Sequence, residues 1–219
     1  MKKCNVFWWL LAAFGGLLFF WLFVMKLIVR FVKKGDGVPC PFAPSWIVDN
    51  PLRRWDVRNA LVYAGLRPGE TVLELGPGPG AFTLDAAQRV GPAGKVIAVD
   101  IQPEMIAQVQ ARVQAAGVTN VDTHVANAYE LPLEDASVDR AYLITVLPEI
   151  PDPVRALCEI YRVLKPGGVV SMTEEFLDPD YPLRATTTAW AQAAGFEAAG
   201  QYGNGWYYTL NFRKPALSV

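Results

Sequence analysis

The nine residues Val72–Gly80, VLELGPGPG, decide the fold of this 219-residue chain. The short run rich in valine and leucine predicts a buried strand, and the alternating glycines that follow it predict a tight turn. The next segment, FTLDAAQRV from Phe82 to Val90, has the spacing of a helix. A strand, a glycine turn and a helix in this order are typical of the first unit of an open α/β sheet, in which ligands bind at that turn.

Strand and helix patterns alternate along much of the remaining chain. Four further segments have the short, β-rich pattern of strands, and these are KVIAVD, NVDTHV, VDRAYLITV and GVVSMT. This alternation predicts a Rossmann-like, doubly wound sheet that is mostly parallel, with helices on both faces. Near the end, the turn signal Asn204-Gly205 separates two strand-like runs and predicts a C-terminal antiparallel hairpin strand.

The first 34 residues differ sharply from the rest. Val6–Met25 are 20 consecutive uncharged, mostly apolar positions, which is the length that a helix needs to cross about 30 Å of hydrocarbon. No polar stripe interrupts them and no A-x-A-like cleavage site follows, so we predict one transmembrane helix rather than a core helix or a signal peptide. Two basic residues precede this span and four follow it. This asymmetry predicts a single-pass membrane protein whose folded domain faces the cytosol.

The chain is predicted to have three parts: a membrane anchor with basic flanks at 1–34, a Gly- and Pro-rich linker at 35–48, and one domain at 49–219. Six of the 20 Lys and Arg residues and none of the 21 acids lie in the anchor, so the rest of the chain has 14 basic and 21 acidic residues, a net charge of −7. Such an acidic surface is poorly suited to nucleic acid, so none is expected as a partner. The three cysteines lack metal-ligand spacing, and no metal site is predicted.

Gly76, Gly78 and Gly80 alternate with Pro77 and Pro79. Dinucleotide-binding folds use G-x-G-x-x-G at this place, because backbone N–H groups there hold a pyrophosphate. Each proline removes one N–H donor, whereas the glycines still let the backbone approach a flat, uncharged group. The turn therefore favours an adenosyl group over a pyrophosphate.

The segment Glu74–Gly80, ELGPGPG, resembles the E/D-x-G-x-G-x-G motif of class I S-adenosylmethionine-dependent methyltransferases. EIYRVLKPGG, residues 159–168, resembles the helix and turn that lead into the fifth strand of that family. The resemblance covers Asp49 to Lys214 and implies S-adenosyl-L-methionine as cofactor and methyl transfer as reaction. It assigns to the cofactor site the residues Glu74, Gly76, Gly78, Gly80, Asp100, Ile101, Asn127 and Ala128.

The resemblance also implies particular roles for three of these residues. Asp100 matches the acid whose two carboxylate oxygens accept hydrogen bonds from the ribose hydroxyls. Asn127 and Ala128 lie where many members have Asp followed by a small residue at the adenine edge. Asn127 replaces that Asp, and its amide oxygen can still accept a hydrogen bond from the adenine N6 group.

The identity of the acceptor is not encoded in any motif. Methyl transfer needs mainly positioning of the two reactants, with a general base only where the acceptor must lose a proton. Glu149 is the candidate base, because it follows the fourth strand at a position where relatives often have His. Glu174, Glu175 and Tyr129 are further candidates, whereas the single histidine, His124, is predicted to be a sheet residue.

The predicted anchor favours a small, lipophilic acceptor, because a tether raises the concentration of enzyme near a substrate dissolved in lipid. Quinone precursors, phospholipid head groups, isoprenoids and lipophilic thiols all fit this description. Two alternatives stay open. One is a non-catalytic subunit of a membrane complex that binds S-adenosylmethionine or a dinucleotide, and the other is a membrane-tethered protein or tRNA methyltransferase.

Overall fold

The computed structural model describes residues 3–20, 24, 49, 51, 57–178 and 180–216. The α-helices are α1 (Lys3–Phe19), α5 (Ala60–Ala64), α6 (Thr83–Val90), α7 (Pro103–Ala115), α8 (Pro153–Val163) and α9 (Arg184–Ala193), and a 3-10 helix, η2, covers Leu147–Glu149. The strands are β1 (Thr71–Leu75), β2 (Lys95–Asp100), β3 (Val121–Val125), β4 (Val138–Ile144), β5 (Leu164–Glu175), β6 (Glu197–Gly203) and β7 (Tyr207–Arg213).

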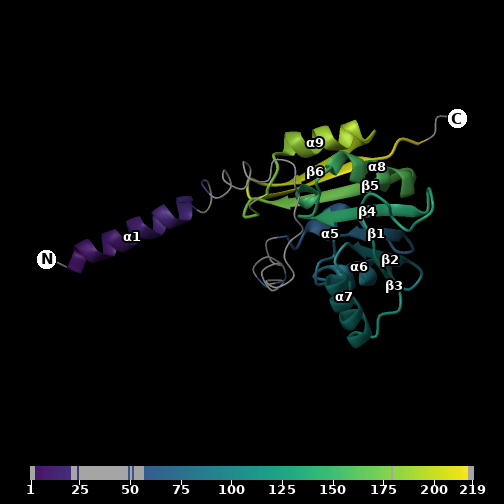
Figure 1. The fold of residues 1–219 in the computed structure, drawn as a ribbon, viewed down its shortest axis with the longest axis horizontal. Helices are drawn as coiled ribbons and strands as arrows, with labels where there is room; N and C mark the ends of the chain where they lie inside the picture. The colour runs from purple at the N-terminus through teal and green to yellow at the C-terminus, as the bar shows by residue number, and fades with distance from the viewer. Residues whose placement is uncertain are drawn as a thin grey trace.

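The seven strands form one sheet in the order β3-β2-β1-β4-β5-β7-β6. Strands β1 to β5 pair in parallel, and β7 pairs antiparallel with both β5 and β6 (Figure 1). This confirms the predicted Rossmann-like sheet with an antiparallel hairpin at its end. Strands β2 and β3 lie on one side of β1, and the chain then crosses to the other side, where it forms β4. The carboxyl ends of β1 and β4 therefore flank the switch point at which such sheets bind ligands.

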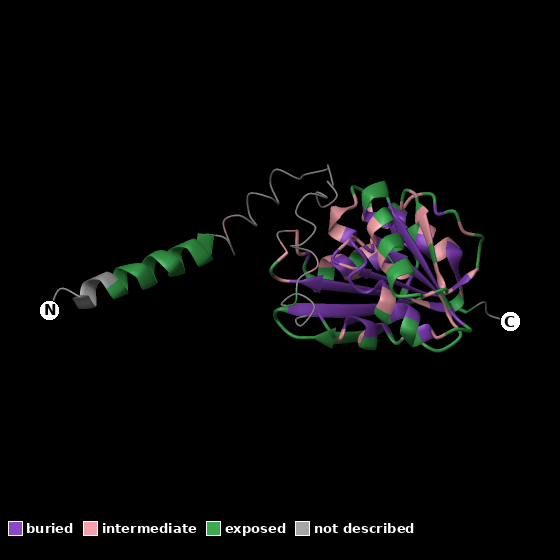
Figure 2. Cartoon of the chain, turned by 90° about the horizontal axis from the view of Figure 1, so that it is seen from below, coloured by how far each residue is buried: buried purple, intermediate pink, exposed green. Residues whose placement is uncertain are grey.

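Helices cover both faces of the sheet, as two adjacent residues of β1 show. Val72 packs in a cluster with residues of α5 and α6, whereas Leu73 packs in a cluster with residues of α8 and α9. Both side chains are fully buried, because successive side chains of a strand point to opposite faces. The central strands accordingly lie buried between partly exposed helices, whereas β6, at one edge of the sheet, is largely exposed (Figure 2).

Asn204 forms the predicted turn between β6 and β7. Its Oδ1 atom accepts hydrogen bonds from the backbone N–H groups of Trp206, at 2.8 Å, and of Tyr207, at 3.3 Å. Its own N–H donates to the Tyr207 carbonyl at 2.8 Å. Asparagine favours turns because its side chain can bond to the backbone in this way.

Helix α5 precedes β1, covers Ala60–Ala64 and ends at Gly65, whose φ is +67°. Residues 52–56 and the predicted linker at 35–48 lie outside the described residues.

The predicted transmembrane helix at Val6–Met25 is wrong. Helix α1 has 17 residues. In the part of the chain that the structure describes, no helix is both long and apolar enough to cross a membrane. The predicted localisation, a single-pass membrane protein with a cytosolic domain, and the membrane as a partner are corrected with it.

Candidate active site

The glycine turn leaves β1 at the carboxyl edge of the sheet. The φ angles of Gly76, Gly78 and Gly80 are +68°, +53° and +84°, a region that residues with a side chain rarely adopt. A Cβ atom at Gly76 would lie 2.5 Å from the side chain of Val146, which follows β4. The Gly76 N–H donates to the Val99 carbonyl at 2.8 Å. The turn therefore packs directly against the segment after β4, and no side chain fits between them.

Asp100 ends β2 beside this turn. It is 8 % exposed, and its Oδ1 atom accepts a hydrogen bond from the Gln102 N–H at 2.9 Å. Burial raises the pKa of this carboxyl above its ordinary value. It outweighs the hydrogen bonds from the backbone N–H groups of Gln102, Gly78 and Ile101, which lower the pKa. The side chain of Ile101 is 52 % exposed. A buried acceptor thus lies beside an apolar side chain that is open to a ligand.

Asn127 and Ala128 follow β3 and lie close to Asp100 along the same edge. The Ala126 N–H donates to the Asp100 carbonyl at 3.0 Å, which fixes the start of this loop. Oδ1 of Asn127 accepts a hydrogen bond from the Tyr129 N–H at 3.0 Å. Because a carboxamide oxygen has two lone pairs, it keeps the capacity to accept a second hydrogen bond.

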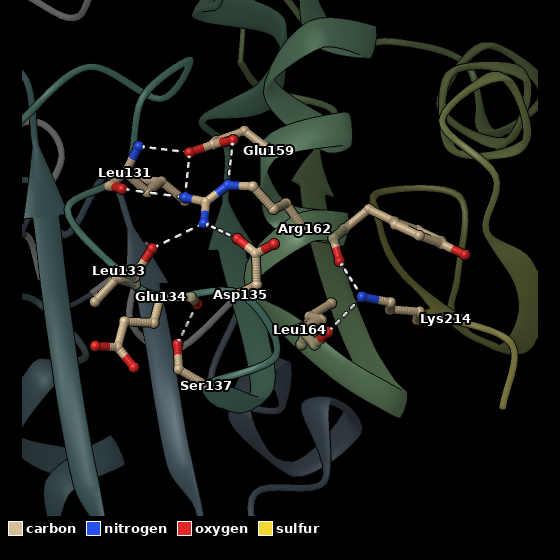
Figure 3. A network of polar contacts seen from close by, with 10 residues as sticks. Leu131, Leu133, Glu134, Asp135, Ser137, Glu159, Arg162, Leu164 and Lys214 are labelled. Atoms are coloured by element: carbon tan, nitrogen blue, oxygen red, sulfur yellow. Dashed lines mark hydrogen bonds and ion pairs between the residues drawn. The ribbon is translucent and has the colours of Figure 1, made fainter. Parts of the chain in front are cut away.

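Helix α8 holds this loop through a guanidinium group that the motifs did not single out (Figure 3). Arg162 donates from Nη1 to the Leu133 carbonyl at 2.9 Å and to Asp135 Oδ1 at 2.6 Å. From Nη2 it donates to the Leu131 carbonyl at 3.2 Å and to Glu159 Oε1 at 2.6 Å. Glu159 also accepts from the Leu131 N–H at 2.8 Å. The hydrogen bond from Arg162 is the largest of the influences that lower the pKa of Glu159.

Glu149 lies at the end of the 3-10 helix after β4, where its N–H donates to the Val146 carbonyl at 3.0 Å. It is half-buried and close in the chain to the residue that packs on the glycine turn. The other two carboxyl candidates, Glu174 and Glu175, end β5 and are buried. His124 lies within β3 opposite Val99, as predicted.

Three buried polar groups near the turn complete the site. Burial raises the pKa of Glu74 to about 7, although the side chains of Thr83 and Tyr142 face its carboxylate and lower that pKa. Oε2 of Glu74 and both hydroxyls have no hydrogen bond of standard geometry within the described residues. Glu74 and Tyr142 line a pocket together with Gly76 and Pro77. Buried polar atoms in such a position suit a polar ligand group.

Residues 73–172 match the family model described as a methyltransferase domain. These residues are a class I S-adenosylmethionine-dependent methyltransferase domain. The chain that contains this domain is 36 % identical over 160 residues to the ubiquinone/menaquinone biosynthesis C-methyltransferase UbiE of Hydrogenovibrio crunogenus, covering 70 % of this chain and 63 % of that protein. It is also 38 % identical over 124 residues to the arsenite methyltransferase of Halobacterium salinarum, covering 57 % of this chain and 32 % of that protein. The chain therefore spans less than two thirds of each of these curated relatives.

A solved structure shares the fold of the methyltransferase domain. The crystal structure of a SAM-dependent methyltransferase from Aquifex aeolicus superposes with a TM-score of 0.75 at 24 % identity, covering 80 % of this chain and 99 % of that one. S-adenosyl-L-methionine is the cofactor of the family. The site fits such a ligand, because Glu74 and Tyr142, whose buried oxygens lack hydrogen bonds of standard geometry within the described residues, line the pocket beside Gly76 and Pro77.

Sequence reasoning missed Thr83, Tyr142 and Arg162. Tyr142 is marked in the sequence only as a hydroxyl-bearing residue within the otherwise apolar run AYLI. Arg162 lies inside the segment that resembles the family, but its loop partners Leu131 and Leu133 lie about 30 residues earlier in the chain. No local pattern connects them.

Proposed function

We propose that this protein transfers a methyl group from S-adenosyl-L-methionine to a small, lipophilic acceptor of the quinone-precursor class. Support for the acceptor class comes from the relative named for ubiquinone and menaquinone biosynthesis. The observation that carries the methyl-transfer proposal is the Asp100 carboxylate, buried beside a glycine turn that two prolines deprive of N–H donors. This arrangement offers hydrogen-bond acceptors to ribose hydroxyls and few N–H donors to a pyrophosphate.

We assign each part of the cofactor to a part of the site. Asp100 accepts hydrogen bonds from the ribose hydroxyls, and Ile101 contacts a face of the adenine. Asn127 and Ala128 bind the edge of the adenine. The backbone of Gly76, Gly78 and Gly80 approaches the adenosyl group, and Glu74 faces its methionine end. We take the domain to extend over 49–219, because β6 and β7 belong to the same sheet as β1.

The reaction is an in-line displacement at the methyl carbon. An electron pair of the acceptor forms the new bond while the carbon–sulfur bond breaks, and S-adenosylhomocysteine leaves with the electron pair of the broken bond. Proximity and orientation supply most of the acceleration. Where the acceptor is a phenol or a quinol, Glu149 takes the proton that it loses.

The deciding experiment measures binding first and transfer second, on the full chain. In titration calorimetry S-adenosylhomocysteine binds and NAD does not; tighter binding of NAD would overturn the cofactor assignment. Labelled methyl transfer from S-adenosylmethionine to 1,4-naphthalenediol then tests catalysis. Glu149→Gln lowers kcat and leaves the Kd of S-adenosylhomocysteine unchanged. Cofactor binding without transfer to this or any other quinol would favour a non-catalytic binding subunit.

A further inference from the structure

The carboxyl end of β5 lies next to the segment that touches the glycine turn. The Thr145 N–H, just after β4, donates to the Thr173 carbonyl of β5 at 2.8 Å. Strand β5 ends two residues later at Glu175, opposite Tyr207 of β7. Because neighbouring strands lie about 4.8 Å apart, the start of β7 is roughly 10 Å from the end of β4. An acceptor of roughly this length would reach from one strand end to the other.

Four aromatic side chains gather at this end of β5 and β7. We call them the aromatic cluster, and they are Phe176, Tyr181, Trp206 and Tyr208. The ring centroid of Phe176 lies 5.5 Å from that of Tyr181 and 5.7 Å from that of Trp206, and Tyr181 lies 5.5 Å from Tyr208. All three pairs are edge-to-face, a favoured geometry. The Phe176 N–H also donates to the Trp206 carbonyl at 2.6 Å, which ties the loop after β5 to the hairpin turn. The cluster is therefore already in place without a ligand.

The aromatic cluster is packed on one side and open on the other. Tyr208 is fully buried, and its hydroxyl is within 2.8 Å of Thr187 Oγ1. Trp206, in contrast, is 58 % exposed, and so are Leu177, at 54 %, and Leu183, at 58 %, on the loop between β5 and α9. Large apolar side chains exposed beside a ligand-binding edge are typical of a binding surface.

The charges around the aromatic cluster favour an uncharged ligand. The guanidinium carbon of Arg184 lies 5.3 Å from the ring centroid of Tyr208, and its Nη2 donates to the Asn204 carbonyl at 2.7 Å. One ring of the cluster thus already faces a cation, so the cluster is not an empty cage for a second one. Burial and then the negative charge of Glu174 raise the pKa of Tyr208, which keeps its hydroxyl neutral.

We propose that the aromatic cluster binds an uncharged aromatic ring of the methyl acceptor, with Trp206, Leu177 and Leu183 as its exposed contacts. This inference rests on the proposed methyl transfer and adds where the acceptor lies and what chemistry it has. A ring held at the start of β7 directs the reacting end of the acceptor toward the end of β4. Glu149 and the glycine turn lie at that end.

The test uses the full chain saturated with S-adenosylhomocysteine and two probes, uncharged 2-naphthol and cationic trimethylphenylammonium. By calorimetry 2-naphthol binds the wild type, and Trp206→Ala weakens its binding roughly fivefold, the order expected for one aromatic contact. Trp206→Phe restores most of the affinity. The control Val62→Ala removes an equally exposed apolar side chain from α5 and leaves 2-naphthol binding unchanged. All variants keep the Kd of S-adenosylhomocysteine, which shows that they are folded.

Each other outcome overturns a distinct statement. If the wild type binds S-adenosylhomocysteine but not 2-naphthol, the aromatic cluster is not the acceptor site. The same holds if 2-naphthol binds Trp206→Ala as tightly as the wild type. Tighter binding of trimethylphenylammonium than of 2-naphthol would make it a site for a cationic amine instead. If S-adenosylhomocysteine itself does not bind the wild type, the proposed methyl transfer fails, and the assignment of an acceptor fails with it.

Discussion

The hydroxyl of Tyr129 accepts a hydrogen bond from the backbone N–H of Asp152 at 2.8 Å. Tyr129 belongs to the loop after β3, and Asp152 caps α8 by accepting a hydrogen bond from the Arg155 N–H at 3.0 Å. The guanidinium carbon of Arg155 lies 4.6 Å from the centroid of the Tyr129 ring. One tyrosine therefore joins the loop that we assign to the adenine to the loop that carries Glu149.

Tyr129→Phe removes this hydrogen bond and keeps the ring against Arg155. We expect the free energy of unfolding to fall by about 1 kcal/mol, the usual net value of one such bond. Urea denaturation measures this change. Tyr202→Phe, at an exposed position on β6, is the matched control and should leave the free energy of unfolding unchanged. Equal stability of wild type and Tyr129→Phe would show that the bond between the loops contributes nothing.

Asp100→Ala should weaken binding of S-adenosylhomocysteine by about 1–3 kcal/mol, because the ribose hydroxyls lose their buried partner. Asp100→Asn keeps one acceptor oxygen and should fall between Asp100→Ala and the wild type. The control is Asp122→Ala, which removes a carboxylate paired with Lys95 on the exposed surface. Titration calorimetry gives the dissociation constants of the wild type and the three variants, and an unchanged value for Asp100→Ala would move the ribose site elsewhere.

Glu74 should make the protein without cofactor less stable as the pH rises. Burial raises its pKa to about 7 in the folded protein, from 4.5 for an ordinary glutamate. Between these two values the folded state binds more protons than the unfolded state, so the free energy of unfolding falls with rising pH. The full effect is about 3 kcal/mol, and it is complete once the pH exceeds the folded pKa.

Glu74→Gln removes this titration and keeps the shape of the side chain. Urea denaturation at pH 5 and pH 8 should show a smaller loss of stability in this variant than in the wild type. Glu197→Gln, at an exposed position on β6, should follow the wild type at both pH values. Parallel pH profiles for Glu74→Gln and the wild type would mean that Glu74 does not titrate in this range.

Arg162→Ala should disturb both the fold and the cofactor site. It removes the guanidinium that donates to the Leu133 carbonyl and pairs with Glu159, and it leaves the Leu131 carbonyl with the Leu133 N–H as donor. We expect a loss of roughly 2 kcal/mol in the free energy of unfolding, as for hydrogen bonds to a charged group. Binding of S-adenosylhomocysteine should weaken as well, because the loop that positions Asn127 loosens.

The control for this change is Arg213→Ala, which removes an exposed guanidinium at the end of β7. It should change neither stability nor the Kd of S-adenosylhomocysteine. If Arg162→Ala lowers stability while the Kd stays the same at a temperature where the variant is folded, the contacts of α8 support the fold alone.

Element order and turn chemistry were predictable because they depend on neighbours in the sequence. Glycine readily adopts the positive φ found at Gly76, and the side chain of Asn204 accepts hydrogen bonds from the backbone two and three residues ahead. Both features can therefore be recognised from the local sequence. The position of Asp100 at the end of β2 follows from the length of an apolar run. Each of these features is set within a few residues.

The N-terminal helix shows where such reasoning stops. Apolar composition at Val6–Met25 predicted a span, but among the described residues no helix is both long and apolar enough to be one. The same segment was the first reason to expect a lipophilic acceptor, and that proposal now depends on the relatives and on the aromatic cluster.

The sequence alone determined the Rossmann-like sheet, its hairpin and the glycine turn, because these arise from periodicity and from the conformations that glycine, proline and asparagine allow. Only the tertiary structure placed Tyr142 against Glu74, Arg162 against Leu131, and Trp206 against Phe176. These partners are about 30 to 70 residues apart in the chain. They meet because strand order and helix packing bring distant segments together, and burial then changes the pKa of Glu74 in a way that no local pattern encodes.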